Sequence, residues 1–385
     1  MQSIAAVLHG VEDLRLMQRP VAQPGPGQVL VRVAAVGLCG SDVHYWKDAM
    51  IKGQAMQLPT TDGFQGVMGH EASGVVEAVG PGVEHLRVGD SVALEAGVPC
   101  GQCPTCAGGR YNLCPRVRFL GSFLSKCPGA LAQLLLHPAQ WCHKLPAHVS
   151  LDEAALLEPL NVALASVRKA AVAPGHRVLI TGAGAVGLLT LRAALSAGAT
   201  HVIVTDTQAQ RLAMASRLGA SATMNAKEVD VAASVKAGQL EGFDSCIECS
   251  GADVCIATCI RACKSGGKCV LVGIGAHADA TIPLADATQR EVDIMGVFRY
   301  CNLYKAAIDL VASGAVDVKP LISHHYALED VAEAFRTATR GEGVKVLIHP
   351  NKSRDELPRP KLVPTFARVG VDGGFCHCCG LEAHS

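Results

Sequence analysis

The spacing of hydrophobic positions changes along the chain. Over residues 1–150, short apolar or alternating runs are separated by glycine and proline, a pattern typical of β-strands joined by turns. This part is therefore expected to form an irregular, mostly β domain. The strands we predict in it lie at 29–36, 72–79, 91–94 and 131–137.

From about residue 151, apolar runs alternate with stretches of helical period. Runs buried on both faces, with helices between them, indicate a parallel sheet covered by helices. After residue 299, the same kinds of element are expected to return to the first domain. The predicted strands lie at 177–181, 201–205, 222–225, 243–248, 267–273, 322–326 and 344–348, and the predicted helices at 185–197, 208–218, 254–262, 303–312 and 329–338.

These patterns predict an α/β protein of two domains. We expect a β-rich catalytic domain at 1–157, a doubly wound nucleotide-binding domain at 158–298 and a return to the catalytic domain at 299–350. Residues 351–385 are rich in proline and charge and keep no sustained period, so we expect a disordered tail there.

Charge and hydropathy exclude several classes of partner. Lys and Arg number 34, as do Asp and Glu, so the formal net charge of zero directs the chain toward neither nucleic acid nor an anionic membrane. The most apolar stretch, 178–191, is shorter than a membrane span, and the first residues lack the basic segment of a secretion signal. We expect a soluble cytoplasmic protein without a membrane or nucleic-acid partner.

A glycine-rich motif opens the second domain. Gly182, Gly184 and Gly187 form a GxGxxG pattern between a predicted strand and a predicted helix, the context in which this motif binds the pyrophosphate of a dinucleotide. The next strand is followed by Asp206, where an acid accepts hydrogen bonds from the ribose of NAD and repels the 2′-phosphate of NADP. Arg211 lies one turn into the next helix, where it could stack beside adenine or admit some NADP. The predicted cofactor is NAD.

Three segments carry the residues of a catalytic metal site. Cys39, His70 and Glu71 can supply the three protein ligands of a working zinc site, which leaves one position for water or substrate. Glu158 could contact the zinc through water or act as a fourth ligand, and the sequence leaves both open. Each residue alone has an ordinary explanation as a core or surface side chain. Together, and upstream of a dinucleotide motif, they indicate a catalytic zinc.

A second cysteine cluster has the spacing of a structural zinc site. Cys100, Cys103, Cys106 and Cys114 follow the pattern C-x2-C-x2-C-x7-C, and four closely set thiolates form a closed tetrahedral zinc site. We therefore expect two zinc ions per chain. We also expect the second ion to stabilise a lobe of low apolar content that is separate from the chemistry.

These motifs together resemble the zinc-dependent medium-chain dehydrogenases, and within them the sorbitol and xylitol dehydrogenase branch. The resemblance covers residues 3–350. It implies a GroES-like β domain joined to a Rossmann domain, with the active site in the cleft between them. The segments that carry it are GLCGSDVHYW (37–46), GHEASGVVEAVG (69–80), LLEPLNV (156–162), GAGAVG (182–187), VTD (204–206), IECSGA (247–252) and REVDIMGVFRYCN (290–302).

The resemblance also implies an activity and roles for single residues. Zinc would polarise a secondary hydroxyl of a polyol such as sorbitol or xylitol, and NAD would accept the hydride. Ser41 and His44 would carry the released proton toward solvent. A homotetramer is implied as well. The implied substrate contacts are Tyr45, Glu158, Arg299 and Tyr300, and the implied NAD contacts, besides the glycines, are Val186, Asp206, Arg211, Val272, Gly273, Ile274, Val297, Phe298 and Arg299.

Departures from the branch pattern leave the substrate the least determined feature. The segment 119–129 differs from the usual one, which is shorter and rich in proline, and Ala163 and Ala165 replace a Gly and a His that this branch often has. A threonine or simple alcohol dehydrogenase is one alternative, against which Glu158 and Arg299 argue. A zinc- and NAD-binding protein without turnover is the other, against which the complete ligand set argues.

Overall fold

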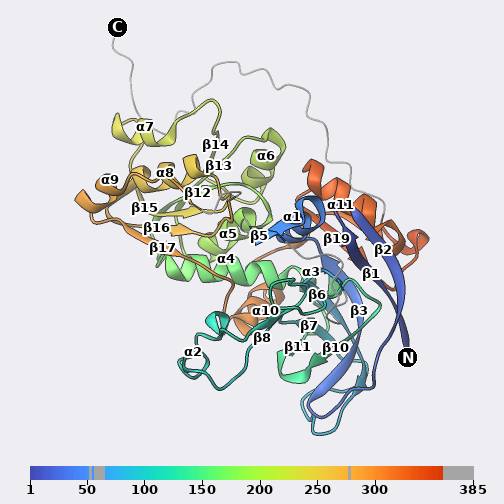
Figure 1. Cartoon of the computed structure of the whole chain (residues 1–385). Helices are drawn as coiled ribbons and strands as arrows, with labels where there is room; N and C mark the ends of the chain where they lie inside the picture. The colour runs from blue at the N-terminus through green and yellow to red at the C-terminus, as the bar shows by residue number, and fades with distance from the viewer. Residues whose placement is uncertain (52–53, 56–65, 276–278, 359–385) are drawn as a thin grey trace.

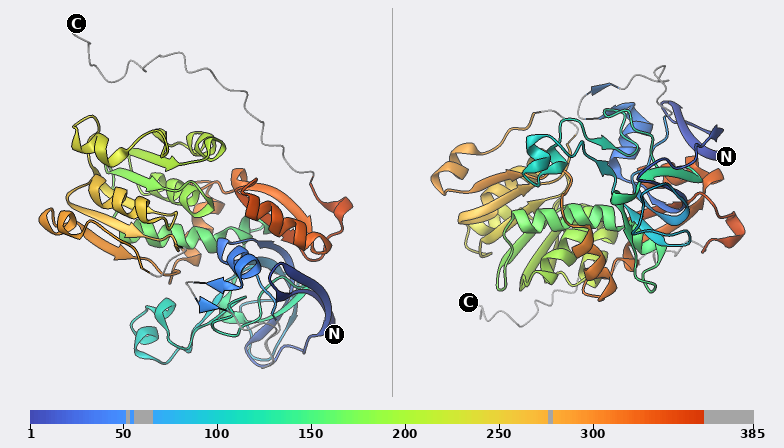
Figure 2. Two further views of the ribbon diagram at one scale, coloured as in Figure 1. Left: turned by 45° about the horizontal axis from the view of Figure 1, so that its top comes forward. Right: turned by 90° about the horizontal axis from the view of Figure 1, so that it is seen from below.

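The computed structural model describes residues 1–51, 54–55, 66–275 and 279–358. They form two domains that lie side by side, one rich in antiparallel strands and one built on a parallel sheet (Figure 1, Figure 2). The last helix and strands, residues 322–349, drawn in red, lie beside the blue strands of the first domain. The catalytic domain is therefore assembled from both ends of the chain.

A mixed sheet of seven strands forms the centre of the catalytic domain. Its Val- and Leu-rich strands pack with the rings of Trp46 and Phe335, whose centroids are 5.5 Å apart, in one apolar core. Pairs of strands form smaller ribbons beside it. The sheet order is β11 (Cys142–Lys144), β7 (Ser91–Leu94), β6 (Glu71–Val79), β3 (Gln28–Gly37), β19 (Lys345–His349) and β18 (Ile322–Ala327), with β10 (Leu134–Pro138) also on β3; the ribbons are β1 (Gln2–Gly10) with β2 (Asp13–Pro20), β4 (Met50–Ile51) with β5 (Gln54–Ala55) and β8 (Gly97–Val98) with β9 (Arg118–Phe119).

The second domain is built on six parallel strands. Its first strand lies in the middle, and the chain proceeds outward first to one side and then to the other, which is the strand order of a Rossmann fold. The order across the sheet is β14 (Ala222–Asn225), β13 (His201–Asp206), β12 (Arg177–Thr181), β15 (Phe243–Glu248), β16 (Cys263–Leu271) and β17 (Asp293–Gly296).

Helices cover both faces of this parallel sheet (Figure 1). On one face Val178 belongs to the same buried cluster as the helical Leu188, and on the other Leu179 belongs to a cluster with Val231 and Cys259. The predicted α/β class with a doubly wound sheet is therefore confirmed. The helices are α1 (Gly40–Asp48), α2 (Pro104–Ala107), α3 (Leu151–Ala155), α4 (Leu157–Lys169), α5 (Ala185–Ser196), α6 (Ala209–Arg217), α7 (Val231–Lys236), α8 (Asp253–Ala262), α9 (Leu284–Gln289), α10 (Tyr304–Ala312) and α11 (Val331–Arg340).

The helices α3 and α4 carry the chain from the first domain into the second. Ser150 caps α3: its hydroxyl accepts a hydrogen bond from the Glu153 amide at 3.3 Å, and its own amide donates to the Glu153 carboxylate at 3.1 Å. The helix α4 begins at Leu157, directly after the end of α3, and packs on α5 and α10. This connection determines where Glu158 lies.

Some element bounds differ from the predicted ones. The strand β10 begins at Leu134 and not at 131, because the backbone of 129–131 is bonded to the loop before β6, with the Leu131 amide donating to the Met68 carbonyl at 2.9 Å. The pattern also missed the β1–β2 hairpin, since most side chains of β2 are exposed and show little alternation. The short helices α1 and α3 were missed for lack of a sustained period.

The predicted tail begins with residues that are bonded to the catalytic domain. Asn351 donates to the carbonyls of Val33 and Gln133 at 2.8 and 2.9 Å, and Arg354 pairs with Asp330. The remaining residues, 359–385, lie outside the described part of the chain, so their disorder stays a prediction. Within the described part, the helices are too short or too polar to cross a membrane.

Candidate active site

Cys39, His70 and Glu71 lie where two paired strands meet. Cys39 follows β3 and caps α1, whereas His70 immediately precedes Glu71, the first residue of β6. Since β3 and β6 are antiparallel with Gly37 opposite Glu71, the end of one strand adjoins the start of the other. One ligand atom of each of the three residues lies within 4.8 Å of the others. The structure thus brings together the residues predicted to hold the catalytic zinc, which we call the metal cluster.

Two glycines make room for the metal cluster. Gly69 has a φ of 89°, and a Cβ there would lie 2.8 Å from the Val36 Cγ1 atom. A Cβ at Gly37 would collide with the Glu71 carboxylate. A side chain at Gly37 would therefore displace Glu71, and one at Gly69 would displace Val36 and Leu131 beside the cluster.

Asp42 orients His70. This buried carboxylate has its Oδ1 atom 3.6 Å from His70 Nδ1, and it accepts hydrogen bonds from the amides of Gly69 and Cys39 at 3.2 and 3.1 Å. Burial alone lowers the pKa of His70, but Asp42 and Cys39 beside the ring raise it well above its ordinary value. A carboxylate behind a metal-binding imidazole fixes the ring orientation. Asp42 is a positioning residue that the sequence reasoning missed.

A buried lysine from the other end of the chain faces Glu71. The Lys345 Nζ atom lies 2.8 and 2.6 Å from the two Glu71 carboxylate oxygens and donates a further hydrogen bond to the Leu38 carbonyl at 3.0 Å. Burial lowers the pKa of Lys345, but the Glu71 carboxylate outweighs this effect and raises it. Because an ionised carboxylate has about four lone-pair sites, this pair leaves Glu71 free to bind a metal as well.

Glu158 lies in the first turn of α4, and the charges of His70 and Glu71 act on it. Burial raises the pKa of Glu158 to about 7, an effect that His70 opposes and Glu71 increases. The metal cluster, whose ligand atoms lie within 4.8 Å of one another in the described part of the chain, does not include Glu158. Its contact with zinc, direct or through water, therefore stays a prediction.

Arg299 and Tyr300 bring polar atoms without partners to this site. The buried Arg299 Nη1 atom and Tyr300 hydroxyl have no hydrogen-bond partner in the described part of the chain. Burial lowers the pKa of Arg299. The charges of Tyr300, Glu158 and Tyr45 oppose this decrease in part. Arg299 also has a φ of 57°, an uncommon backbone for a residue with a Cβ. Since such unpaired groups cost about 1–3 kcal/mol each, they are suited to a ligand with several hydroxyl groups.

Two phenylalanines from the segment that departs from the branch pattern line the site. The centroids of the Phe119 and His70 rings are 5.3 Å apart. The Arg299 guanidinium carbon lies 4.0 Å from the centroid of the Phe119 ring. The Phe123 ring lies 4.9 Å from that of the buried Tyr45. These rings form an apolar wall beside the metal cluster. The sequence marked the segment as unusual but could not assign these contacts.

Ser41 and His44 both lie on α1, the helix that Cys39 caps. Ser41 is half-buried, whereas the His44 side chain is 51% exposed, with its Nδ1 atom 3.3 Å from the Asp48 carboxylate. The helix thus begins at the metal cluster and presents a histidine to solvent one turn further on. The part of these residues in proton transfer stays a prediction.

The glycine motif lies at the turn from β12 to α5. Gly182 has a φ of 93°, and a Cβ at Gly187 would collide with the Gly182 carbonyl oxygen. Around Gly184, the N-cap of α5, a Cβ would meet no atom within 4 Å, so a ligand can approach the backbone there. Strands β12 and β15 flank the point at which the strand order reverses, where Rossmann folds bind dinucleotides.

Asp206 ends β13 beside this turn. Its carboxylate accepts hydrogen bonds from the Ala183 amide at 2.7 Å and the Gln208 amide at 2.9 Å, and the Arg211 Nη1 atom lies 3.9 Å away. Asp206 therefore balances the charge of Arg211 in this structure. The motif and its acid lie where Rossmann folds bind a dinucleotide.

The other predicted NAD contacts follow the carboxyl ends of neighbouring strands. A Cβ at Gly273 would collide with the Gly251 backbone, which explains the glycine at that position. Large apolar side chains are exposed along this edge, with Ile274 48% and Phe298 40% exposed. The residues placed at this edge are Val186 in the first turn of α5, Val272, Gly273 and Ile274 after β16, and Val297, Phe298 and Arg299 after β17.

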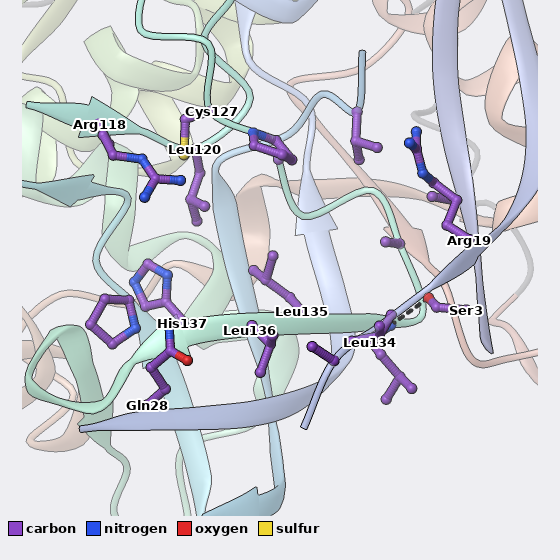
Figure 3. Close-up of a pocket in the computed structure, with 18 of the residues that line it drawn as sticks. Ser3, Arg19, Gln28, Arg118, Leu120, Cys127, Leu134, Leu135, Leu136 and His137 are labelled. Atoms are coloured by element: carbon purple, nitrogen blue, oxygen red, sulfur yellow. Dashed lines mark hydrogen bonds between the residues drawn. The ribbon is translucent and has the colours of Figure 1, made fainter. Parts of the chain in front are cut away.

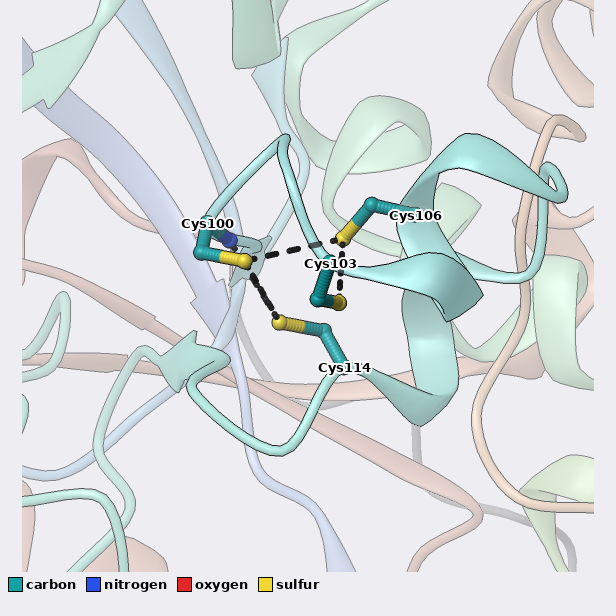
Figure 4. A group of neighbouring side chains, drawn as sticks. All are labelled: Cys100, Cys103, Cys106 and Cys114. Carbon is teal, nitrogen blue, oxygen red and sulfur yellow. Dashed lines mark hydrogen bonds between the residues drawn. The ribbon is translucent and has the colours of Figure 1, made fainter.

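The four predicted structural cysteines converge in a lobe between β8 and β9 (Figure 4). The Sγ atoms of Cys103 and Cys106 are 3.4 Å apart, those of Cys100 and Cys114 are 3.5 Å apart, and those of Cys100 and Cys106 are 4.0 Å apart. In a tetrahedral zinc site with Zn–S bonds of about 2.3 Å, the sulfur atoms lie about 3.8 Å from one another. The four thiols therefore fit a zinc ion.

This cysteine lobe docks on the segment that carries Arg299. The Asn112 side chain donates to the Phe298 carbonyl at 2.8 Å, and the Asn302 side chain donates to the Gly109 carbonyl at 2.9 Å. The expectation that the lobe is separate from the chemistry did not include these contacts, and it stays a prediction. These contacts join two segments that are far apart in sequence.

Replacing Cys100 with serine should reduce the zinc content from two ions to one per chain, because three thiolates no longer close the site. The midpoint of thermal unfolding should fall, and KM for the substrate should rise more than KM for NAD as the lobe loosens. Elemental analysis, thermal unfolding and steady-state kinetics measure these effects. Cys255→Ser, in α8, is the control and should retain both ions. Full zinc content in Cys100→Ser would contradict the assignment.

A cavity of about 400 Å³ lies in the catalytic domain between the β1–β2 hairpin and β10 (Figure 3). Arg19 and Arg118 reach its edges, and three successive leucines of β10 line it. Among the described residues that line it, none belongs to the metal cluster. Leu120 and Cys127 line this cavity. The segment 119–129 therefore lies between the cavity and the metal cluster, which it contacts through Phe119.

A Rossmann sheet joined to a β-rich domain that holds a Cys-His-Glu cluster is typical of metal-dependent dehydrogenases. Comparison with known proteins agrees. Residues 25–147 match the family described as Alcohol dehydrogenase GroES-like domain, and residues 185–313 match the family described as Zinc-binding dehydrogenase. The sorbitol dehydrogenase of Macaca fascicularis is 44% identical over 352 residues, which cover 90% of this chain and 96% of that protein. The chain belongs to the zinc-binding medium-chain dehydrogenases.

Solved structures show the same architecture over most of the chain. L-idonate 5-dehydrogenase from Escherichia coli superimposes with a TM-score of 0.83 at 27% identity and covers 91% of this chain and 98% of that chain. A short chain alcohol dehydrogenase from E. coli, complexed with NADH, has a TM-score of 0.82 at 25% identity and covers 90% of this chain and 99% of that chain. The GroES-like and Rossmann domains expected from the sequence are thereby confirmed.

Proposed function

We propose that this protein oxidises a secondary hydroxyl of a small polyol, such as sorbitol or xylitol, to the ketose, with hydride transfer to NAD. The observation that carries the proposal is the unpaired, buried Arg299 Nη1 atom and Tyr300 hydroxyl close to Glu158. A chain of hydroxyl groups can pair with both, whereas a simple alcohol leaves them without partners. The identity of 44% to a sorbitol dehydrogenase supports the same class of substrate.

The donors of the metal cluster suit zinc. A thiolate, an imidazole and a carboxylate are the ligand types that zinc takes in catalytic sites, and Asp42 supports the imidazole from behind. When bound, zinc supplies Lewis acidity that makes a nearby hydroxyl group easier to deprotonate. Cys39, His70 and Glu71 would hold it.

The residues of this chain orient the substrate and remove its proton. The Arg299 guanidinium and the Tyr300 and Tyr45 hydroxyls bind the hydroxyl groups that do not react, which fixes the carbon to be oxidised. The Gly182–Gly187 motif and Asp206 would hold NAD, which would supply the hydride acceptor. Ser41 and His44 carry the hydroxyl proton to solvent. Phe119 and Phe123 exclude water from this step.

Replacing Asp206 with serine should narrow the preference for NAD over NADP. The carboxylate accepts hydrogen bonds from the ribose and repels a 2′-phosphate, so kcat/KM for NAD should fall by about tenfold while that for NADP holds or rises. Initial rates at varied NAD and NADP, with substrate saturating, measure the change. Asp355→Ser, at an exposed position after β19 in the other domain, is the matched control. Equal use of both cofactors by the native enzyme would refute the role assigned to Asp206.

We also propose that the enzyme is a homotetramer, on the basis of its resemblance to the polyol branch. Light scattering of the purified chain tests this. The substrate class itself is tested by comparing NADH formation with sorbitol, xylitol, threonine and butane-2,3-diol.

A further inference from the structure

A second group of possible metal ligands lies in the catalytic domain, apart from the metal cluster. Asp152 comes from α3, His325 from β18, and His349 is the last residue of β19. One ligand atom of each lies within 4.8 Å of the others. We call these three residues the Asp-His-His cluster. The dehydrogenase chemistry proposed above uses none of them.

The hydrogen bonds of His349 define its tautomer. Its Nδ1 atom lies 3.1 Å from the Ala34 carbonyl oxygen, and its Nε2 atom lies 2.9 Å from His325 Nδ1. Because a carbonyl oxygen only accepts, Nδ1 carries the hydrogen and Nε2 presents its lone pair to the cluster. Metal-binding histidines have this arrangement, with the second ring nitrogen donating to a backbone carbonyl.

Asp152 adds a carboxylate to the two imidazoles. Its oxygens lie 3.8 Å from His325 Nδ1 and 3.8 Å from His349 Nδ1, both too long for a hydrogen bond. Two ligands of a tetrahedral zinc ion, each at about 2.0–2.1 Å, lie about 3.3 Å apart. The two ligand pairs that share His325 Nδ1, with His349 Nε2 at 2.9 Å and with Asp152 at 3.8 Å, would need only small shifts to reach this distance, in which the metal takes the place of the hydrogen between the two rings. The His349 side chain is 1% exposed, that of His325 11% and that of Asp152 30%. The cluster is therefore anchored in the core and open on the carboxylate side.

We propose that Asp152, His325 and His349 form a third metal site of this chain and bind a zinc ion. Two imidazoles and one carboxylate are a ligand set that zinc takes in proteins, with water in the open position. The site is distinct from the metal cluster, since His349 lies four residues beyond Lys345 on β19, about 13 Å along the strand.

The third site has a structural consequence. A metal held by the cluster ties α3 to β18 and β19, which come from the opposite end of the chain. The helix α3 leads directly into α4 and Glu158, so the ion braces the connection between the two domains next to the active site.

The test is a zinc titration of the full-length, tag-free protein that already holds its first two ions. Elemental analysis after equilibrium dialysis should find one zinc more in the native protein than in His325→Gln and Asp152→Asn. Excess zinc should also raise the unfolding temperature of the native protein and leave that of these variants unchanged. Cobalt(II) added to the zinc-loaded protein should give d–d bands without a thiolate charge-transfer band, because the site contains no sulfur.

The control is His324→Gln, which changes the neighbouring histidine of β18 and should bind as much zinc as the native protein. The comparison with His325→Gln also cancels any metal bound by the Cys376–Cys379 segment, which both proteins share. Equal zinc contents in the native protein, His325→Gln and Asp152→Asn would overturn the proposal and leave a hydrogen-bonded cluster only. The outcome does not depend on the substrate, so failure of the proposed function would not affect it.

Discussion

Replacing Arg299 with alanine is expected to lower kcat/KM for xylitol or sorbitol by about tenfold to a hundredfold. The half-buried Arg299 has a buried Nη1 atom without a partner in the described chain, and the charges of Tyr300, Glu158 and Tyr45 act on its guanidinium. A polyol pairs with this donor, whereas a simple secondary alcohol leaves it unpaired, so the loss should appear with the polyol and be small with butan-2-ol. Steady-state kinetics with both substrates measure the difference.

Two controls separate substrate binding from other roles of Arg299. Zinc content should be unchanged in Arg299→Ala, because the side chain is not a ligand. Arg15→Ala, on the exposed strand β2 where Arg15 pairs with Asp13, removes an arginine outside the site and should keep polyol activity. If Arg299→Ala lost activity on polyol and simple alcohol in equal proportion, Arg299 would serve the cofactor or the fold, and the polyol assignment would lose its main support.

Replacing Lys345 with methionine is expected to reduce the free energy of unfolding of the zinc-free protein by roughly 3–5 kcal/mol. The substitution leaves the Glu71 carboxylate buried without its cationic partner, in a site where both side chains are at most 2% exposed. Zinc bound at Glu71 restores a positive charge beside the carboxylate. The difference between native and variant protein should therefore shrink when zinc is present. Urea unfolding of chelated and zinc-loaded proteins measures it.

The double variant Lys345→Met with Glu71→Gln is the control for this prediction. It removes both charges, so it should recover much of the stability lost in Lys345→Met. Loss of the structural zinc on chelation affects all the proteins alike and cancels in the comparison. An equal loss of stability with and without zinc would mean that Glu71 does not bind the metal.

The sequence predictions were most accurate for elements that a local hydrophobic pattern defines. The strand before the glycine motif and the strand ending at Asp206 are continuous apolar runs, and the structure has them at Arg177–Thr181 and His201–Asp206. Cys39, His70 and Glu71 could be recognised as possible metal ligands because each lies in a short, continuous motif. Their meeting in space follows from the pairing of β3 with β6.

Contacts between distant parts of the chain escaped the sequence. Lys345 is 274 residues from Glu71, and no local pattern joins them. The Asn112 side chain donates to the Phe298 carbonyl across 186 residues, and the sequence did not predict this contact between the cysteine lobe and the segment that carries Arg299. Asp42 was within reach, since it lies in the first turn of the helix that Cys39 caps, a position where an acid often bonds the capping backbone.

The most direct test of the central claim is the turnover of the zinc-loaded enzyme with NAD across a panel of sorbitol, xylitol, threonine, butane-2,3-diol and butan-2-ol, followed by NADH absorbance. The account predicts that kcat/KM for the better polyol exceeds that for butan-2-ol by at least about tenfold, because only a polyol satisfies Arg299 and Tyr300. Equal efficiency with butan-2-ol, or a preference for threonine, would contradict it.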